Sequence, residues 1–308
     1  MNAIFNPRRL GHINLIVGQL ERSTRFYNEV CGLVLEFSET GLRGNFLGTG
    51  NTHHDVATIE RTSEDRYGKD GHLQIPKEAA AKVALNHVAW EMDNELELVR
   101  GYERAQRAGI ALGRVSDHQI THSIYLKDPD GNVVEFYADV IRDWRGVLHG
   151  EVDHITSVWQ PDSRTANPAS LWDAAPVLRR VDRAPFHPTR LSHVVLGTEN
   201  LARMAAFYQE VAGLRLVYSD EAVSLLQALH ESSPYHLALV HTPQSKGLHH
   251  FSFEVADARE LERSQEGPLK ASQYVADPDG FRVEFFSRRS ADYAAVGRAN
   301  VGARAFLV

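Results

Sequence analysis

The nine residues Asp128–Phe136, DPDGNVVEF, recur as DPDGFRVEF over Asp277–Phe285. Upstream of these phrases, RLGHINLIV at Arg9–Val17 is matched by RLSHVVL at 190–196. In each copy a Phe-Tyr pair follows the histidine of that stretch at the same distance, and a Gly-Leu pair follows soon after. Such agreement in register between distant segments indicates a tandem duplication.

Each half contains a weaker internal repeat, because LNHVAWE at Leu85–Glu91 and LHHFSFE at Leu248–Glu254 each begin a second strand-and-helix unit. Apolar periodicity predicts helices over 20–30 and 95–108, and alternating or β-branched runs predict strands over 10–17, 55–59, 85–92 and 132–137. We therefore predict an α+β fold of four βαβββ units paired into two domains. The expected parts are an N-terminal domain (1–145), a connector (146–189) with a short helix near Leu171, and a C-terminal domain with a tail (190–308).

Composition limits the class of protein. The 308 residues are 43% hydrophobic and 24% charged, which suits about two soluble domains. A net charge of -7 gives no indication that the protein binds nucleic acid or an anionic membrane surface. No stretch reaches the roughly 20 apolar residues of a membrane span, and the first residues carry no apolar signal region. With its single cysteine, Cys31, the chain suits a reducing compartment, and we expect a cytoplasmic protein.

The 16 histidines are more than structure requires, and some fall at repeated strand positions. His12 and Asn14 share one face of their strand, His87 begins the second unit, and Glu135 lies between two apolar residues of the last strand. A buried carboxylate needs a partner, and a cation supplies one. Two histidines and one carboxylate suit a facial Fe(II) site.

Taken singly, each of these residues has a simpler interpretation. A histidine in an apolar strand is more often a core residue than a ligand, and Glu135 alone suits a solvent-facing edge. The same His, His, Glu pattern recurs in the second half as His193, His250 and Glu284. This recurrence in register favours a metal site over three unrelated residues.

The sequence resembles the vicinal-oxygen-chelate superfamily and, within it, the two-domain type I extradiol catechol dioxygenases. The resemblance covers nearly the whole chain apart from the connector and the tail. It implies that His12, His87 and Glu135 are the metal ligands, and that the metal is Fe(II), with Mn(II) as the alternative. It also implies that a small aromatic diol and O2 are the substrates and that the chain forms a homo-oligomer.

Further residues match the family's active-site motifs. The resemblance implies that His54, His118 and Tyr125 are catalytic and that Asn14 matches a family asparagine. We add Asn14, Phe46 and His122 as expected substrate-binding residues. Two other functions stay open: a glyoxalase-type lyase or isomerase, which usually needs a second carboxylate, and a non-enzymatic protein that binds aromatic compounds.

The second half carries a less complete set of these residues. Tyr274 and His236 look like copies of Tyr125 and His54, but no histidine stands between His250 and Tyr274 to match His118. We therefore expect the reaction in the first half, although many two-domain relatives use the second. A third arrangement would combine His12 with His250 and Glu284 across the two halves.

Overall fold

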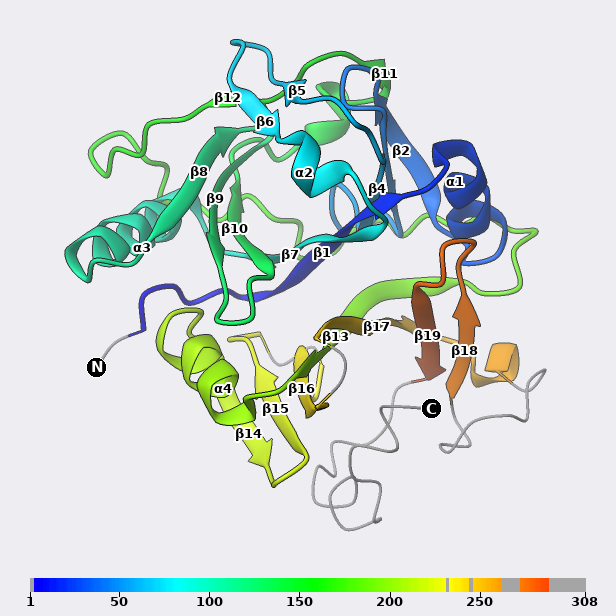
Figure 1. Cartoon of the computed structure of the whole chain (residues 1–308). Coiled ribbons are helices and arrows are strands. Elements are labelled where there is room, and N and C mark those ends of the chain that lie inside the picture. The colour runs from blue at the N-terminus through cyan, green and yellow to red at the C-terminus, as the bar shows by residue number, and fades with distance from the viewer. Residues whose placement is uncertain (1–2, 231–232, 244–245, 262–271, 288–308) are drawn as a thin grey trace.

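The computed structural model describes residues 3–230, 233–243, 246–261 and 272–287, and the chain forms two curled β-sheets with helices outside them (Figure 1). The predicted tail lies outside these residues from 288 onward. The helices are α1 (Leu20–Glu29), α2 (Lys77–Ala80), α3 (Glu95–Arg107) and α4 (Leu201–Glu210), with short 3-10 turns η1 (Trp144–Gly146) and η2 (Ala258–Leu261). In spatial order the first sheet is β11 (Gly150–Val152), β2 (Val34–Glu39), β3 (Gly44–Gly48), β4 (Val56–Glu60), β1 (Arg9–Val17), β7 (Ala84–Glu91), β10 (Val133–Asp139), β9 (Thr121–Lys127), β8 (Leu112–Asp117) and β12 (Ser157–Val158). The second is β14 (Arg215–Ser219), β15 (Val223–Gln227), β16 (Leu237–His241), β13 (Pro188–Thr198), β17 (Gly247–Val255), β19 (Arg282–Ser287) and β18 (Ser272–Ala276), and β5 (Arg66–Tyr67) pairs with β6 (Leu73–Ile75).

The order of strands in the first sheet confirms the predicted repeat. The unit β1-α1-β2-β3-β4 and the unit β7-α3-β8-β9-β10 lie back to back, because β1 pairs antiparallel with β7. Each first strand also pairs in parallel with the last strand of its own unit, β1 with β4 and β7 with β10. In the second sheet β13 and β17 meet in the same way. The α+β fold of paired units is therefore as predicted.

The helices form where the sequence has clear start and stop signals. Asn94 caps α3 by accepting a hydrogen bond from the backbone N–H of Glu97 at 2.9 Å. Both α1 and α3 are followed by a glycine with positive φ, Gly32 at 77° and Gly109 at 68°, which lets the chain leave the helix. The apolar faces of both helices pack on the first sheet.

The two halves are joined by reciprocal contacts between the repeated motifs. The Tyr27 hydroxyl on α1 donates to Asp277 in the second DPDG turn at 3.1 Å, and Tyr208 on α4 donates to Asp128 in the first turn at 3.2 Å. All four side chains are buried. The repeated Phe-Tyr and DPDG phrases thus hold each half against the other.

The connector differs from the prediction. No helix forms near Leu171, because Pro168 and Pro176 leave too short a run between them and the Trp172 indole is held by Asp93 at 3.0 Å. Instead, β11 and β12 add to opposite edges of the first sheet. The boundaries 1–145, 146–189 and 190–308 stay a prediction, since sheet pairing alone does not define a domain.

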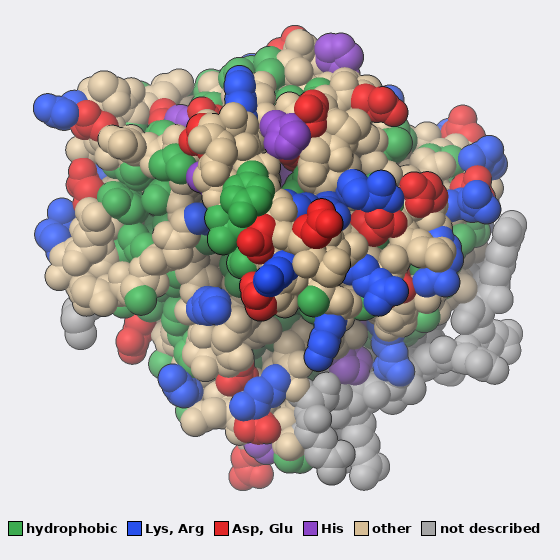
Figure 2. Space-filling view, turned by 45° about the horizontal axis from the view of Figure 1, so that its top comes forward, with side chains coloured by type: hydrophobic (Ala, Val, Ile, Leu, Met, Phe, Trp, Pro, Cys, Tyr) green, Lys and Arg blue, Asp and Glu red, His purple; other side chains and the backbone are tan. Residues whose placement is uncertain are grey.

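The described residues form no single-sign patch on the face in Figure 2, where Lys and Arg side chains lie among Asp and Glu.

None of the helices in the described part of the chain has the length and apolar character that a membrane crossing requires.

Replacing Tyr27 by Phe should lower the free energy of unfolding by about 1–2 kcal/mol, because one oxygen of the buried Asp277 loses its donor. Tyr208→Phe should have a smaller effect, because the same oxygen of Asp128 keeps its hydrogen bond from Asn132. The matched control is Tyr218→Phe, which removes an exposed hydroxyl bonded to Asp220. Urea unfolding measures all three, and equal stability of Tyr27→Phe and the control would contradict the role of this contact.

Candidate metal centre

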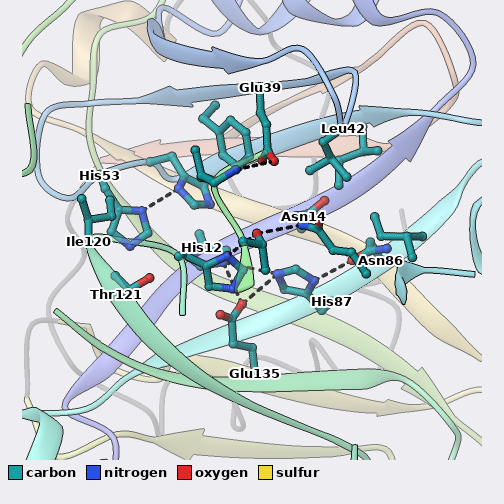
Figure 3. Close-up of a pocket in the computed structure, with 18 of the residues that line it drawn as sticks. His12, Asn14, Glu39, Leu42, His53, Asn86, His87, Ile120, Thr121 and Glu135 are labelled. Carbon is teal, nitrogen blue, oxygen red and sulfur yellow. Dashed lines mark hydrogen bonds and ion pairs between the residues drawn. The ribbon is translucent and has the colours of Figure 1, made fainter. Parts of the chain in front are cut away.

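Three buried side chains converge in the first sheet. His12 Nε2 lies 3.1 Å and His87 Nε2 lies 2.8 Å from the same carboxylate oxygen of Glu135, and the two nitrogens are 3.3 Å apart (Figure 3). The three strands that carry them are neighbours in the order β1, β7, β10. The sheet therefore brings together the three residues that the sequence predicted as ligands.

These spacings fit a divalent metal ion. Ligand atoms roughly 2.1 Å from a metal and at right angles to one another are about 3 Å apart. The three measured separations, 2.8 to 3.3 Å, lie around that value. One carboxylate and two imidazoles on one side leave the opposite side free, as in facial non-haem iron sites.

The environment of His87 and Glu135 favours the protonation states in which these side chains bind a cation. Burial lowers the pKa of His87, and its Nδ1 lies 2.6 Å from the side-chain oxygen of Asn86, so that Nδ1 carries the proton and Nε2 faces Glu135. Burial alone raises the pKa of Glu135, yet His87 and His12 hold it well below its ordinary value. Asn86 was not predicted, because nothing in the sequence marks it beyond its place next to a ligand.

His54 lies directly beside the ligands. Its ring centroid is 4.0 Å from that of His12, and its Nδ1 is 2.6 Å from Nδ1 of His53, so one of these nitrogens donates to the other. Burial and the neighbouring histidines lower the pKa of both side chains well below the ordinary value. His54 is therefore a neutral imidazole in the cavity, and its Nε2 has no hydrogen-bond partner among the described residues.

A chain of hydrogen bonds leads to Glu135 from the other side. Tyr125 donates to Glu135 at 2.9 Å, His118 Nε2 lies 3.1 Å from the Tyr125 hydroxyl, and His118 Nδ1 lies 2.9 Å from the Thr156 hydroxyl. Gln74 donates to the same Thr156 hydroxyl at 2.9 Å, which extends the chain beyond His118. Burial lowers the pKa of His118 to about 3, so its ring is neutral. Sequence patterns did not indicate Gln74 or Thr156.

One cavity joins these groups. Asn14 and Phe46 line it as expected, with Phe46 stacked on Phe37 at 4.3 Å between ring centroids. The Asn14 side-chain oxygen is buried and has no hydrogen-bond partner in the described structure. The other walls are mainly apolar: Leu42, Ile59, Ile75, Ile120, Leu148 and Ile155.

His122, which the sequence suggested for substrate binding, does not line this cavity. Tyr125 and Thr121 face the cavity from β9, and the alternation of a strand turns His122 to the opposite face. There it stacks on Trp159 at 4.2 Å and lies 2.7 Å from Glu95 on α3. The period of the strand was the signal that separates these residues.

The second half also brings its three residues together. His193 Nε2 and His250 Nε2 lie 3.3 and 3.8 Å from the same oxygen of Glu284, and all three side chains are buried. The ligand atoms lie within 4.8 Å of one another, as they do in the first half. The halves therefore stay separate, and the structure does not combine His12 with His250 and Glu284.

Strand register corrects the expected copy of His54. Ile13 pairs with Val56 in the first sheet, and Val194 pairs with Leu237 in the second, so Tyr235 takes the place of His54 and His236 takes that of Asp55. The same register places Val195 where the first half has Asn14. Tyr274 lies opposite Glu284 as Tyr125 lies opposite Glu135. The second centre thus keeps its trio and tyrosine but lacks counterparts of His54 and Asn14.

The chain is similar to several known proteins. The chain is 26% identical to a catechol-2,3-dioxygenase of Bacillus subtilis over 246 residues, 78% of this chain and 76% of that protein. It is 30% identical to biphenyl-2,3-diol 1,2-dioxygenase 3 of Rhodococcus globerulus over 169 residues, 54% of this chain and 81% of that protein. The fold is similar to the 2,3-dioxygenase LapB of Pseudomonas sp. KL28, with a TM-score of 0.62, 18% identity and 94% of each chain covered.

A family model also matches residues 9–136 and 190–267, which together are most of the chain and include the first strand of each half. The chain belongs to the Glyoxalase/Bleomycin resistance protein/Dioxygenase superfamily.

Proposed function

We propose that the protein is an extradiol dioxygenase that opens the ring of a catechol-type diol with O2, using Fe(II) held by His12, His87 and Glu135. The observation that carries the proposal is the single cavity in which this trio faces His54, His118 and Tyr125. The similarity to the two curated dioxygenases of Bacillus and Rhodococcus supports the same reaction class. Mn(II) is the alternative metal, and a homo-oligomer stays a prediction.

A bound Fe(II) would hold the diol oxygens and O2 together and let electrons pass between them. The protein's own residues then position the reactants and accept or donate protons. The stacked rings of Phe37 and Phe46 provide a flat apolar wall for the aromatic ring. Because the walls are mainly apolar, the hydrogen bonds within the cavity are stronger than they would be in solvent.

We assign proton transfer to two groups on different sides of the trio: His118 with Tyr125, and His54. The neutral His118 and the Tyr125 hydroxyl form a hydrogen-bonded path along which a proton from a diol oxygen can move. His54, next to His12, is placed to donate a hydrogen bond to the oxygen molecule. Both histidines are neutral imidazoles, so each can accept a proton directly and can pass one on after it has accepted it.

The alternative of a glyoxalase-type lyase lacks support from the ligand set. Such a site needs a second carboxylate among the ligands, and the described residues place only Glu135 with His12 and His87. A simple aromatic-binding protein would have no use for the relay through His118.

His87→Ala should lose both bound iron and ring cleavage, by more than the roughly 10- to 100-fold that loss of an outer partner of a ligand costs. Metal analysis and O2 consumption with catechol measure the two effects. His149→Ala, which removes an exposed histidine, is the control. A His87→Ala protein with full iron and full activity would end the assignment.

His250→Gln should leave ring cleavage at the wild-type level, because we place the reaction in the first half. Iron per chain, measured in the same preparation, reports whether the second trio also binds metal. Loss of activity in His250→Gln with a normal unfolding curve, while His87→Gln stays active, would move the reaction to the second half.

His118→Phe should lower kcat about 100-fold or more, the scale of general acid–base catalysis, while iron content stays unchanged. Tyr125→Phe should act in the same direction, since it interrupts the same path. Single-turnover product formation with iron-loaded protein measures the step. Unchanged kcat in both variants would show that protons leave by another route.

A further inference from the structure

Glu39, at the end of β2, lies in the wall of the cavity away from the metal ligands (Figure 3). Glu39 is only 2% exposed to solvent. Among the described residues its carboxylate has one hydrogen bond, from the backbone N–H of Ile155 at 3.1 Å. The proposed reaction has so far given this acidic side chain no task.

The surroundings of Glu39 are unusual for a buried carboxylate. Phe37, Leu42 and Ile155 are apolar neighbours in the same cavity and the same core cluster. Six glutamates are buried in the described structure, and five have an arginine or histidine nitrogen within 4.0 Å of a carboxylate oxygen. These five are Glu36, Glu91, Glu135, Glu254 and Glu284. Glu39 is the exception within the described residues.

A buried carboxylate without a cationic partner is costly. Burial raises the pKa of Glu39 to about 7, although the Ile155 N–H bond and the more distant His154 and Arg66 act in the opposite direction. A ligand that donates a hydrogen bond to the carboxylate would offset this cost. The position in the cavity wall makes the bound substrate the natural source of such a donor.

We propose that Glu39 is a specificity-determining residue that accepts a hydrogen bond from a hydroxyl or ammonium substituent on the diol ring. This rests on the proposed ring-cleaving function, and it names the class of diol: one whose ring carries a hydrogen-bond donor away from the two metal-bound oxygens. A substituent that is only apolar would leave the carboxylate without a donor. A carboxylate substituent would meet a like charge.

A second interpretation gives Glu39 a purely structural task, which is to anchor the backbone at Ile155. The two interpretations separate in Glu39→Gln, because the Gln side-chain oxygen can still accept from the Ile155 N–H while the negative charge is lost. Glu39→Leu removes both. Glu64→Gln, at an exposed glutamate, is the matched control.

The test compares matched pairs of diols that differ in one donor: 3- and 4-methylcatechol against 3- and 4-(hydroxymethyl)catechol, with the aminomethyl compounds as the ammonium arm. At pH 8, where a carboxyl group with a pKa of about 7 is mostly ionised, wild type should favour a donor-bearing diol over its methyl partner by about tenfold or more in kcat/KM, the scale of a hydrogen bond to a charged group. Glu39→Leu should abolish this preference. Glu39→Gln should abolish it for the ammonium arm and reduce it for the hydroxyl arm.

Cleavage of unsubstituted catechol by wild type and by the Glu64→Gln control tests the proposed function separately, because this diol has no substituent for Glu39 to bind. Binding of the same pairs without O2, by calorimetry, measures the preference independently of turnover. Equal use of both members of every pair by wild type, or a wild-type preference retained in Glu39→Leu, would overturn the inference. Failure of every diol to bind would overturn both proposals.

Discussion

A negative charge buried at the centre of the first sheet is the constraint on which the rest of the site depends. Glu135 lies between two core residues of β10, and among the described residues only His87 and His12 reach the carboxylate oxygen that Tyr125 does not contact. The trio comes from three separate strands, so Glu135 can share a compensating cation with the two histidines only when β1, β7 and β10 are adjacent. The back-to-back pairing of the two units is therefore what brings the three ligands together.

Duplication explains why the same arrangement occurs twice and why the copies differ. The Tyr-to-Asp contacts between the halves involve both DPDG turns, so both copies stabilise the fold whichever one reacts. The side chains around each trio do not take part in these contacts between the halves. The second half accordingly has Tyr235 and Val195 where the first has His54 and Asn14, while its trio and its tyrosine stay in register.

Repetition and strand period made part of the site predictable from the sequence. His12, His87 and Glu135 repeat in register, so the trio could be found before its geometry was known. His122 shows the limit, because proximity to Tyr125 suggested a shared site and the period of β9 separates them. Gln74 and Thr156 could not be found, since they belong to no repeat and reach the cavity only through the way the chain packs.

The connector is the clearest case of such packing. Two consecutive residues of the connector bond to two different residues of the cavity wall: the Ile155 N–H bonds to Glu39, and the Thr156 hydroxyl bonds to His118. A shift of this segment would therefore change the hydrogen bond to His118 and the hydrogen bond to Glu39 together. It has no counterpart in the repeated units, so it gives the first half groups that duplication alone does not supply. If the proposed function and the proposed role of Glu39 hold, this unrepeated segment is the part of the chain that contacts both the proton path and the substrate-selecting carboxylate.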